Sequence, residues 1–133
     1  MAIAFLIYLE RDVPGTDAGR FGGRALGAAR WELETILTDL DRPGLGRFIS
    51  FSRDEAETLA TDMKFDLPGP GHAEHWFSSR EGLENVRALR DYVRDHPAEV
   101  SECRAVLAEL EEMERLLDAA DRAGVGFRLS VDY

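Results

Sequence analysis

The residues His72-Ala73-Glu74-His75-Trp76 form the most chemically versatile stretch of the chain. Imidazoles and carboxylates bind zinc and exchange protons. A helical zinc pair, however, needs histidines four residues apart and a third ligand, whereas these two are three apart and follow a Pro-Gly-Pro-Gly run that predicts a loop. We therefore predict no metal site, and interpret the stretch as a polar loop anchored by Trp76, with a ligand or partner contact as the alternative.

The glycine-rich segment 11–23 is a second candidate, because it follows an apolar run and precedes a predicted helix. Backbone N–H groups in such loops can hold an anion at a helix N-terminus. The segment contains neither the Gly-Lys-Ser/Thr ending of a phosphate loop nor the dinucleotide fingerprint. Arg20 and Arg24 are still candidates for anion binding, against the simpler interpretation of a mobile loop.

A small-molecule-binding or enzymatic domain would need the loops 11–23 and 68–77 to form one pocket, because functional groups often converge on long loops. The residues of this ligand-binding hypothesis are Arg20, Arg24, His72, His75 and Trp76.

No other residue pattern is a catalytic signature. Cys103 is the only cysteine and lies in an apolar helical stripe, so we predict a buried structural thiol. Adjacent acids such as Glu111 and Glu112 are interpreted as a solvated helix face, since acid–base catalysis needs a desolvated carboxylate. The serines lack a Gly-x-Ser-x-Gly context. The sequence therefore favours a protein without enzymatic activity, assigns no catalytic residue and predicts no cofactor.

Charge is the strongest compositional feature. The chain of 133 residues carries 26 acids against 16 bases, a net charge of −10. A field of this sign repels phosphate backbones and anionic lipid surfaces, so we predict no nucleic-acid binding and no membrane contact. Residues 91–120 alone carry nine acids against three arginines. One face of the molecule is therefore predicted to be markedly negative.

This charge asymmetry supports the first hypothesis for function, a non-enzymatic protein-binding module such as an inhibitor, an antitoxin-like neutraliser or an accessory protein. Its acidic helix face would meet a basic protein, because complementary charge speeds encounter. The outward-facing acids of that surface are predicted to be Glu99, Glu102, Glu109 and Glu112. The alternative is that the strip only keeps the protein soluble. The sequence leaves homo-oligomerisation open.

The N-terminal run 2–9 is apolar but has no basic lead-in and is far shorter than the roughly 20 residues of a membrane span. It predicts neither a signal peptide nor an anchor, so the expected location is the cytoplasm. Fifteen arginines against one lysine are typical of a GC-rich bacterial genome.

The apolar pattern places these residues on a small number of elements. Residues 2–9 read as a central strand covered on both faces, and residues 125–133 as a strand whose Arg128, Ser130 and Asp132 face solvent. Helices are predicted over 24–40 and 52–63, from Ser78 to His96, and from Pro97 to Ala120, with a short strand at 47–51.

The expected fold is one α+β domain over residues 1–133, with a small sheet that includes the N-terminal and C-terminal strands and about four helices packed on it. The predicted core pairs sheet residues with the last helix: Ile3, Phe5, Ile7, Leu129 and Val131 with Leu107, Leu110 and Leu117.

Overall fold

The computed structural model describes residues 3–52, 54, 57 and 74–132. Most of the helix predicted over 52–63, and residues 68–73 of the second predicted loop, lie outside the described residues. The elements in chain order are β1 (Ala4–Leu9), η1 (Ala18–Arg20), α1 (Arg24–Ala28), α2 (Arg30–Asp39), η2 (Leu45–Phe48), α4 (Ser79–Asp95), η3 (Pro97–Glu99), α5 (Cys103–Arg122) and β2 (Phe127–Asp132).

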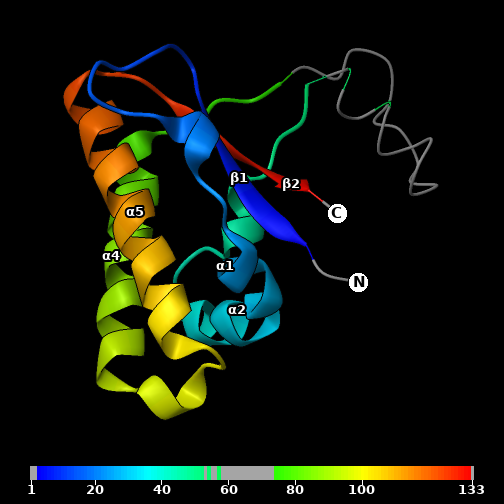
Figure 1. Cartoon of the computed structure of the whole chain (residues 1–133), viewed down its shortest axis with the longest axis vertical. Helices are drawn as coiled ribbons and strands as arrows, with labels where there is room; N and C mark the ends of the chain where they lie inside the picture. The colour runs from blue at the N-terminus through cyan, green and yellow to red at the C-terminus, as the bar shows by residue number, and fades with distance from the viewer. Residues whose placement is uncertain (1–2, 53, 55–56, 58–73, 133) are drawn as a thin grey trace.

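The two end strands pair with each other. β1 and β2 run antiparallel, with Phe5 opposite Val131 and Ile7 opposite Leu129. The chain ends consequently lie side by side (Figure 1). The α+β prediction is confirmed, because the described residues contain this two-stranded sheet and the four helices α1, α2, α4 and α5.

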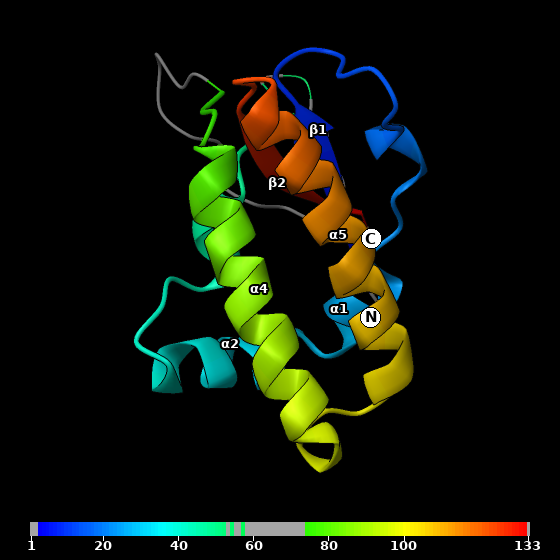
Figure 2. The same ribbon diagram turned by 90° about the vertical axis from the view of Figure 1, so that its left-hand side faces the viewer.

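α4 and α5 form an antiparallel pair that covers one face of the sheet (Figure 2). The predicted capping box begins α4, where the Ser78 hydroxyl accepts a hydrogen bond from the Glu81 N–H at 3.3 Å. The predicted contact between sheet and last helix is confirmed for Phe5, Ile7, Leu129, Leu110 and Leu117, all of which are buried. Ile3 and Val131 are only half-buried, so for them the prediction of burial was wrong. Leu107, which was predicted to pack against the sheet, is half-buried and packs against the core.

The opposite face of the sheet corrects two expectations. Tyr8 on β1 is 39% exposed, so this strand is not covered on both faces as predicted. On β2 the error is reversed, because Arg128 and Ser130 were expected in solvent and are buried, with Arg128 only 4% exposed. Alternation of apolar and polar residues indicates which side chains share a face, but not whether another segment covers that face.

The helix predicted over 24–40 is divided at Ala29 into α1 and α2. Within α1, a Cβ atom on Gly27 would lie 1.9 Å from the Ile3 carbonyl oxygen, so only glycine fits there. The strand predicted at 47–51 is the 3₁₀ turn η2, followed by a single bridge from Ile49 to Leu129.

Candidate functional site

Many acids of α5 face the arginines of α4 rather than solvent. Arg80 lies 3.3 Å from Asp121, and Arg87 lies within 3.7 Å of both Glu114 and Asp118. Arg90 forms a further ion pair with Glu114. In an antiparallel helix pair, residues one or two turns apart on one helix lie opposite residues with the same spacing on the other, which produces this row of ion pairs. A large part of the negative charge of α5 is therefore matched within the helix pair.

Glu109 does not face outward as predicted. Its carboxylate accepts hydrogen bonds from the backbone N–H groups of Ala25 at 3.1 Å and Leu26 at 2.9 Å. These are unpaired donors at the first turn of α1, whose own N-cap residue, Gly23, has no side chain to supply. Glu109 thus caps a neighbouring helix, and its charge is used inside the fold.

The other three acids that were predicted to face outward, Glu99, Glu102 and Glu112, have different surroundings. Glu112 pairs with Arg115 one turn further along the exposed side of α5. Glu99 ends η3 and is exposed, and Glu102 precedes α5 with a left-handed φ of 55°. The Glu99 carboxylate accepts a hydrogen bond from Tyr92 and, together with partial burial and the charge of Asp39, raises the pKa of the tyrosine hydroxyl.

Trp31 is the most exposed large apolar residue described, with 71% of its surface accessible. The adjacent Glu32 accepts a hydrogen bond from the Ser101 N–H at 2.9 Å, which holds α2 beside the start of α5. The Arg30 guanidinium lies 5.0 Å from the centre of the indole ring. We call Trp31, Glu99 and Glu102 the acidic end of the molecule.

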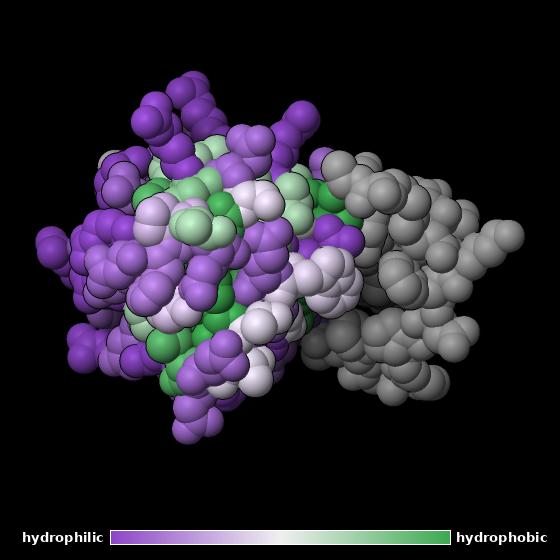
Figure 3. Space-filling model, turned by 90° about the horizontal axis from the view of Figure 1, so that it is seen from below, coloured by the Kyte–Doolittle hydropathy of each residue, from purple (hydrophilic) through white to green (hydrophobic). Residues whose placement is uncertain are grey.

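Sequence reasoning missed Trp31, although the helical pattern contained a signal. The apolar stripe of residues 24–40 recurs at positions 26, 29, 33, 36, 37 and 40, and Trp31 is not on it. A tryptophan off the buried stripe of an amphipathic helix is expected in solvent. Viewed from the end that holds α2 and the α4–α5 connection, the surface is mostly hydrophilic with apolar groups between (Figure 3).

The residues of the ligand-binding hypothesis do not meet in the described part of the chain. Arg20 is exposed and paired with Asp17 at 2.9 Å, and Arg24 is exposed at the start of α1, next to Gly23, which bridges to β1. The second group lies beyond the other edge of the sheet, where Phe77 bridges to β2. His72 lies outside the described residues.

His75 and Trp76 instead belong to a cluster around Arg128. The His75 N–H donates to the Ser50 hydroxyl at 2.7 Å, and the imidazole packs against the Phe77 ring. Trp76 contributes an aromatic face to the buried guanidinium of Arg128, 5.4 Å from its ring centre.

Arg128 connects this segment to the outer face of the sheet. Its guanidinium donates to the Ser50 carbonyl at 2.7 Å, pairs with Glu74 at 3.3 Å and lies 4.3 Å from the Tyr8 ring centre. A planar cation that stacks and forms several directed hydrogen bonds is well suited to burial. The sequence carried no signal for this role, since alternation placed Arg128 among the exposed residues.

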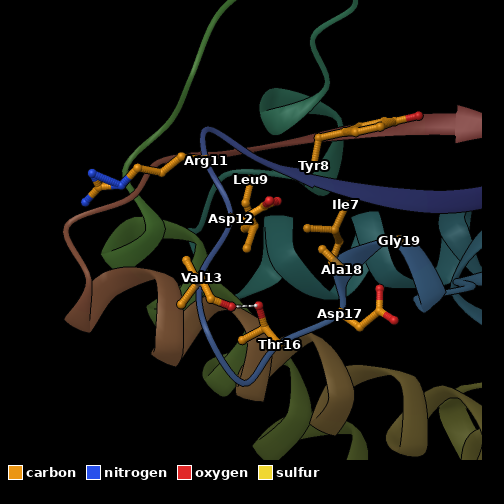
Figure 4. A pocket seen from close by; sticks show the side chains of 10 residues that line it. All are labelled: Ile7, Tyr8, Leu9, Arg11, Asp12, Val13, Thr16, Asp17, Ala18 and Gly19. Carbon is orange, nitrogen blue, oxygen red and sulfur yellow. Dashed lines mark hydrogen bonds between the residues drawn. The ribbon is translucent and has the colours of Figure 1, made fainter.

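A cavity of about 240 Å³ lies between β1 and the first loop (Figure 4). Its walls include Ile7 and Leu9 from the strand, and Val13, Thr16 and Asp17 from the loop. The Arg11 side chain points away from it, and Tyr8 lies on the opposite side of the strand. Among the described residues, the cavity is lined by β1 and the first loop, without residues 74–77 of the second.

The described residues hold no group of three or more His, Cys, Asp or Glu side chains arranged for a metal ion. None of the described helices has the length and apolar content to cross a membrane. Comparison with protein-family models, with curated proteins and with solved structures gave no significant match. Function is therefore inferred from the chain's own residues.

Proposed function

We propose that this protein is a non-enzymatic protein-binding module whose acidic end binds a basic partner. The observation that carries the proposal is the 71% exposed Trp31 beside a connection rich in acids. Between residues 91 and 104, at the end of α4, in η3 and at the start of α5, four acids stand against two arginines.

An exposed tryptophan is well suited to anchor a protein interface. Its large, rigid surface gains much from burial in a partner, and tryptophan is among the residues most enriched at energetic hot spots. Trp31 contributes little to the core of its own protein, so its burial in a partner would cost the fold nothing. Glu99 and Glu102 lie at the edge of this surface, where charge sets the rate and the choice of partner.

The proposal narrows the acidic surface expected from sequence. Glu109 is engaged in capping α1, and the acids at 114, 118 and 121 are matched by α4. Glu112 is half-buried and paired with Arg115. Glu99 and Glu102 therefore have the strongest support as recognition residues. An inhibitor, an antitoxin-like neutraliser and an accessory subunit would all use such a surface.

Affinity capture from a native lysate with matched variants tests the proposal. The test variants are Trp31→Ala and the double reversal Glu99→Lys with Glu102→Lys. The control is Glu84→Lys with Asp132→Lys, which changes net charge equally at two exposed positions away from the acidic end. Trp31→Ala should weaken capture by about 2 kcal/mol or more while leaving stability within about 0.5 kcal/mol, because the ring is exposed.

We expect basic proteins to be retained by the wild type and by the control, and to be lost from both test variants. Retention should also fall as salt is raised, since exposed charges are screened. Equal retention by all four proteins would contradict the proposal and favour an acidic surface that only maintains solubility. Sedimentation of the wild type separates a third outcome, in which Trp31 is buried between two copies of the chain.

A further inference from the structure

An open groove of about 520 Å³ lies on the first half of α5. Its lining comes from η3 and from the first turns of the helix: Pro97, Cys103, Arg104, Leu107, Ala108 and Glu111. α4 and α1 pack against other sides of α5, and Arg104, Ala108 and Glu111 are exposed. The groove is therefore an accessible surface of the folded chain.

Four of the lining residues share one side of the helix. Arg104, Leu107, Ala108 and Glu111 follow one another at intervals of three, one and three residues, the spacing of a single helix face. Leu107 is half-buried and Ala108 is exposed. We call these four residues the α5 face. It has an apolar centre between two opposite charges.

The two charges of the α5 face are available to a second molecule. Glu112 pairs with Arg115 and Asp118 with Arg122, whereas among the described residues neither Arg104 nor Glu111 takes part in an ion pair. They cannot pair with each other, because seven residues of helix separate them by about 10 Å.

An antiparallel copy of the α5 face is its own complement. If two α5 helices pack about a twofold axis between positions 107 and 108, Arg104 of each copy lies opposite Glu111 of the other. Leu107 then lies opposite Ala108, and a large side chain opposite a small one lets two helices approach closely. A partner of uniform charge, in contrast, would meet one of the two charged groups with like charge.

We infer that two copies of this chain associate through the α5 face in an antiparallel, twofold-symmetric dimer. The net charge of −10 opposes this association. At physiological salt that repulsion is screened beyond about 8 Å, whereas the two ion pairs and the apolar contact act at shorter range. Because the interface is confined to one helix face, the dimer is expected to be weak.

Sedimentation equilibrium in about 0.15 M NaCl tests the inference. The wild type should dimerise with a Kd below about 1 mM. Arg104→Glu and Glu111→Arg should each raise the Kd by about fivefold or more, because symmetry places like charges together at both ends of the interface. The double variant, with both substitutions, restores both pairs in exchanged order and should return to within about twofold of the wild type.

Mixing the two single variants separates contact between copies from any effect within one copy. In the mixed dimer, a copy with acids at positions 104 and 111 meets a copy with arginines at both, so both cross pairs are attractive. The mixture should associate at least about fivefold more tightly than either variant alone. Trp31→Ala is the matched control and should leave the Kd unchanged, because Trp31 does not line the groove.

A wild type that stays monomeric up to about 1 mM, or no gain on mixing, would overturn the inference. Tighter association of Glu111→Arg alone would also overturn it, because that result would show net charge to be decisive. Loss of the dimer in Trp31→Ala would assign self-association to the acidic end and not to the α5 face. The inference does not rest on the proposed function, since capture of a basic partner is measured separately and either can fail alone.

Discussion

At the outer edge of β2, Phe127 exchanges two backbone hydrogen bonds with Phe77, and Ser50 donates to the Leu129 carbonyl, whereas at the outer edge of β1 only Phe5 is paired. The two strands have the same length and face the same helices. The difference comes from the chain that returns to them. Segments near residues 50 and 77 both form backbone bridges to β2, whereas only Gly23 forms a bridge to β1, and η1 packs beside β1 without a bridge.

Sheet edges attract other strands, and proteins usually cover them. In this protein the outer edge of β2 is covered by the chain itself. Arg128 connects the segments around Ser50 and Glu74 to the adjacent face of the sheet. The other edge is lined by a cavity with two acids on its wall. The comparison predicts that the bridged edge of β2 contributes more to stability than the outer edge of β1. The following experiments test this difference and then use the acidic end as a reference.

The largest effect is expected at the covered edge, from Phe127→Ala. The Phe127 ring is 1% exposed and lies directly against α4, where a Cβ on Gly82 would be 2.4 Å from the ring. Truncation should lower the free energy of unfolding by about 3 to 5 kcal/mol, measured by urea denaturation. Val131→Ala, a half-buried position on the same strand, should cost only about 1 kcal/mol. Similar losses at both positions would contradict the importance of the packing of the Phe127 ring against α4.

The second-largest effect is expected from Arg128→Ala, which should lower the free energy of unfolding by about 2 to 3 kcal/mol. The change leaves the Ser50 carbonyl without this donor and Glu74 without this cation, and Glu74 is partly exposed, which reduces the cost. Arg128→Lys keeps the charge but not the planar stacking between Tyr8 and Trp76, so it should recover only part of the loss. Full recovery by lysine would mean that charge alone holds this segment, without the aromatic contacts.

Amide hydrogen exchange compares the two edges without any substitution. The Phe127 N–H donates to the Phe77 carbonyl at 3.0 Å, while the Leu9 N–H points to the cavity. The Leu9 amide should exchange about tenfold faster or more, because it can exchange without opening a hydrogen bond. Equal protection in the free protein would indicate that the edge of β1 is already covered in solution.

The smallest effect on stability is expected at the acidic end. This region lies away from both sheet edges and therefore serves as a reference. Glu99 raises the pKa of Tyr92 above its ordinary value of 10.0, so Glu99→Gln should lower that pKa in an NMR titration of the tyrosine ring. A raised pKa in the folded state stabilises the protein below pH 10 and loses this contribution as pH rises through the folded pKa. Above pH 10 the wild type should therefore lose more stability than Glu99→Gln. An unchanged Tyr92 pKa would place the Glu99 carboxylate away from the hydroxyl.

Some of the candidate functional residues could be predicted from the sequence, and others could not. Glu99 and Glu102 were predicted to be exposed and are. Glu109 has the same residue type on the same helix and caps α1 instead, because α1 packs where that carboxylate points. The alternative hypothesis of a pocket between two loops required His75 and Arg20 to meet, and they lie beyond opposite edges of the sheet.

The sequence by itself determined the local elements of this protein. A serine and a glutamate three residues apart begin α4, an apolar stripe defines α5, and two apolar runs at the chain ends make β1 and β2, because each signal acts between neighbours in the chain. The tertiary structure alone decided that Arg128 is buried, that three acids of α5 are matched by arginines of α4, and that the edge of β1 has fewer backbone bridges than the edge of β2. These outcomes depend on which distant segment covers a given face, and the free energy of that contact is shared by residues far apart in sequence, so no local pattern records it.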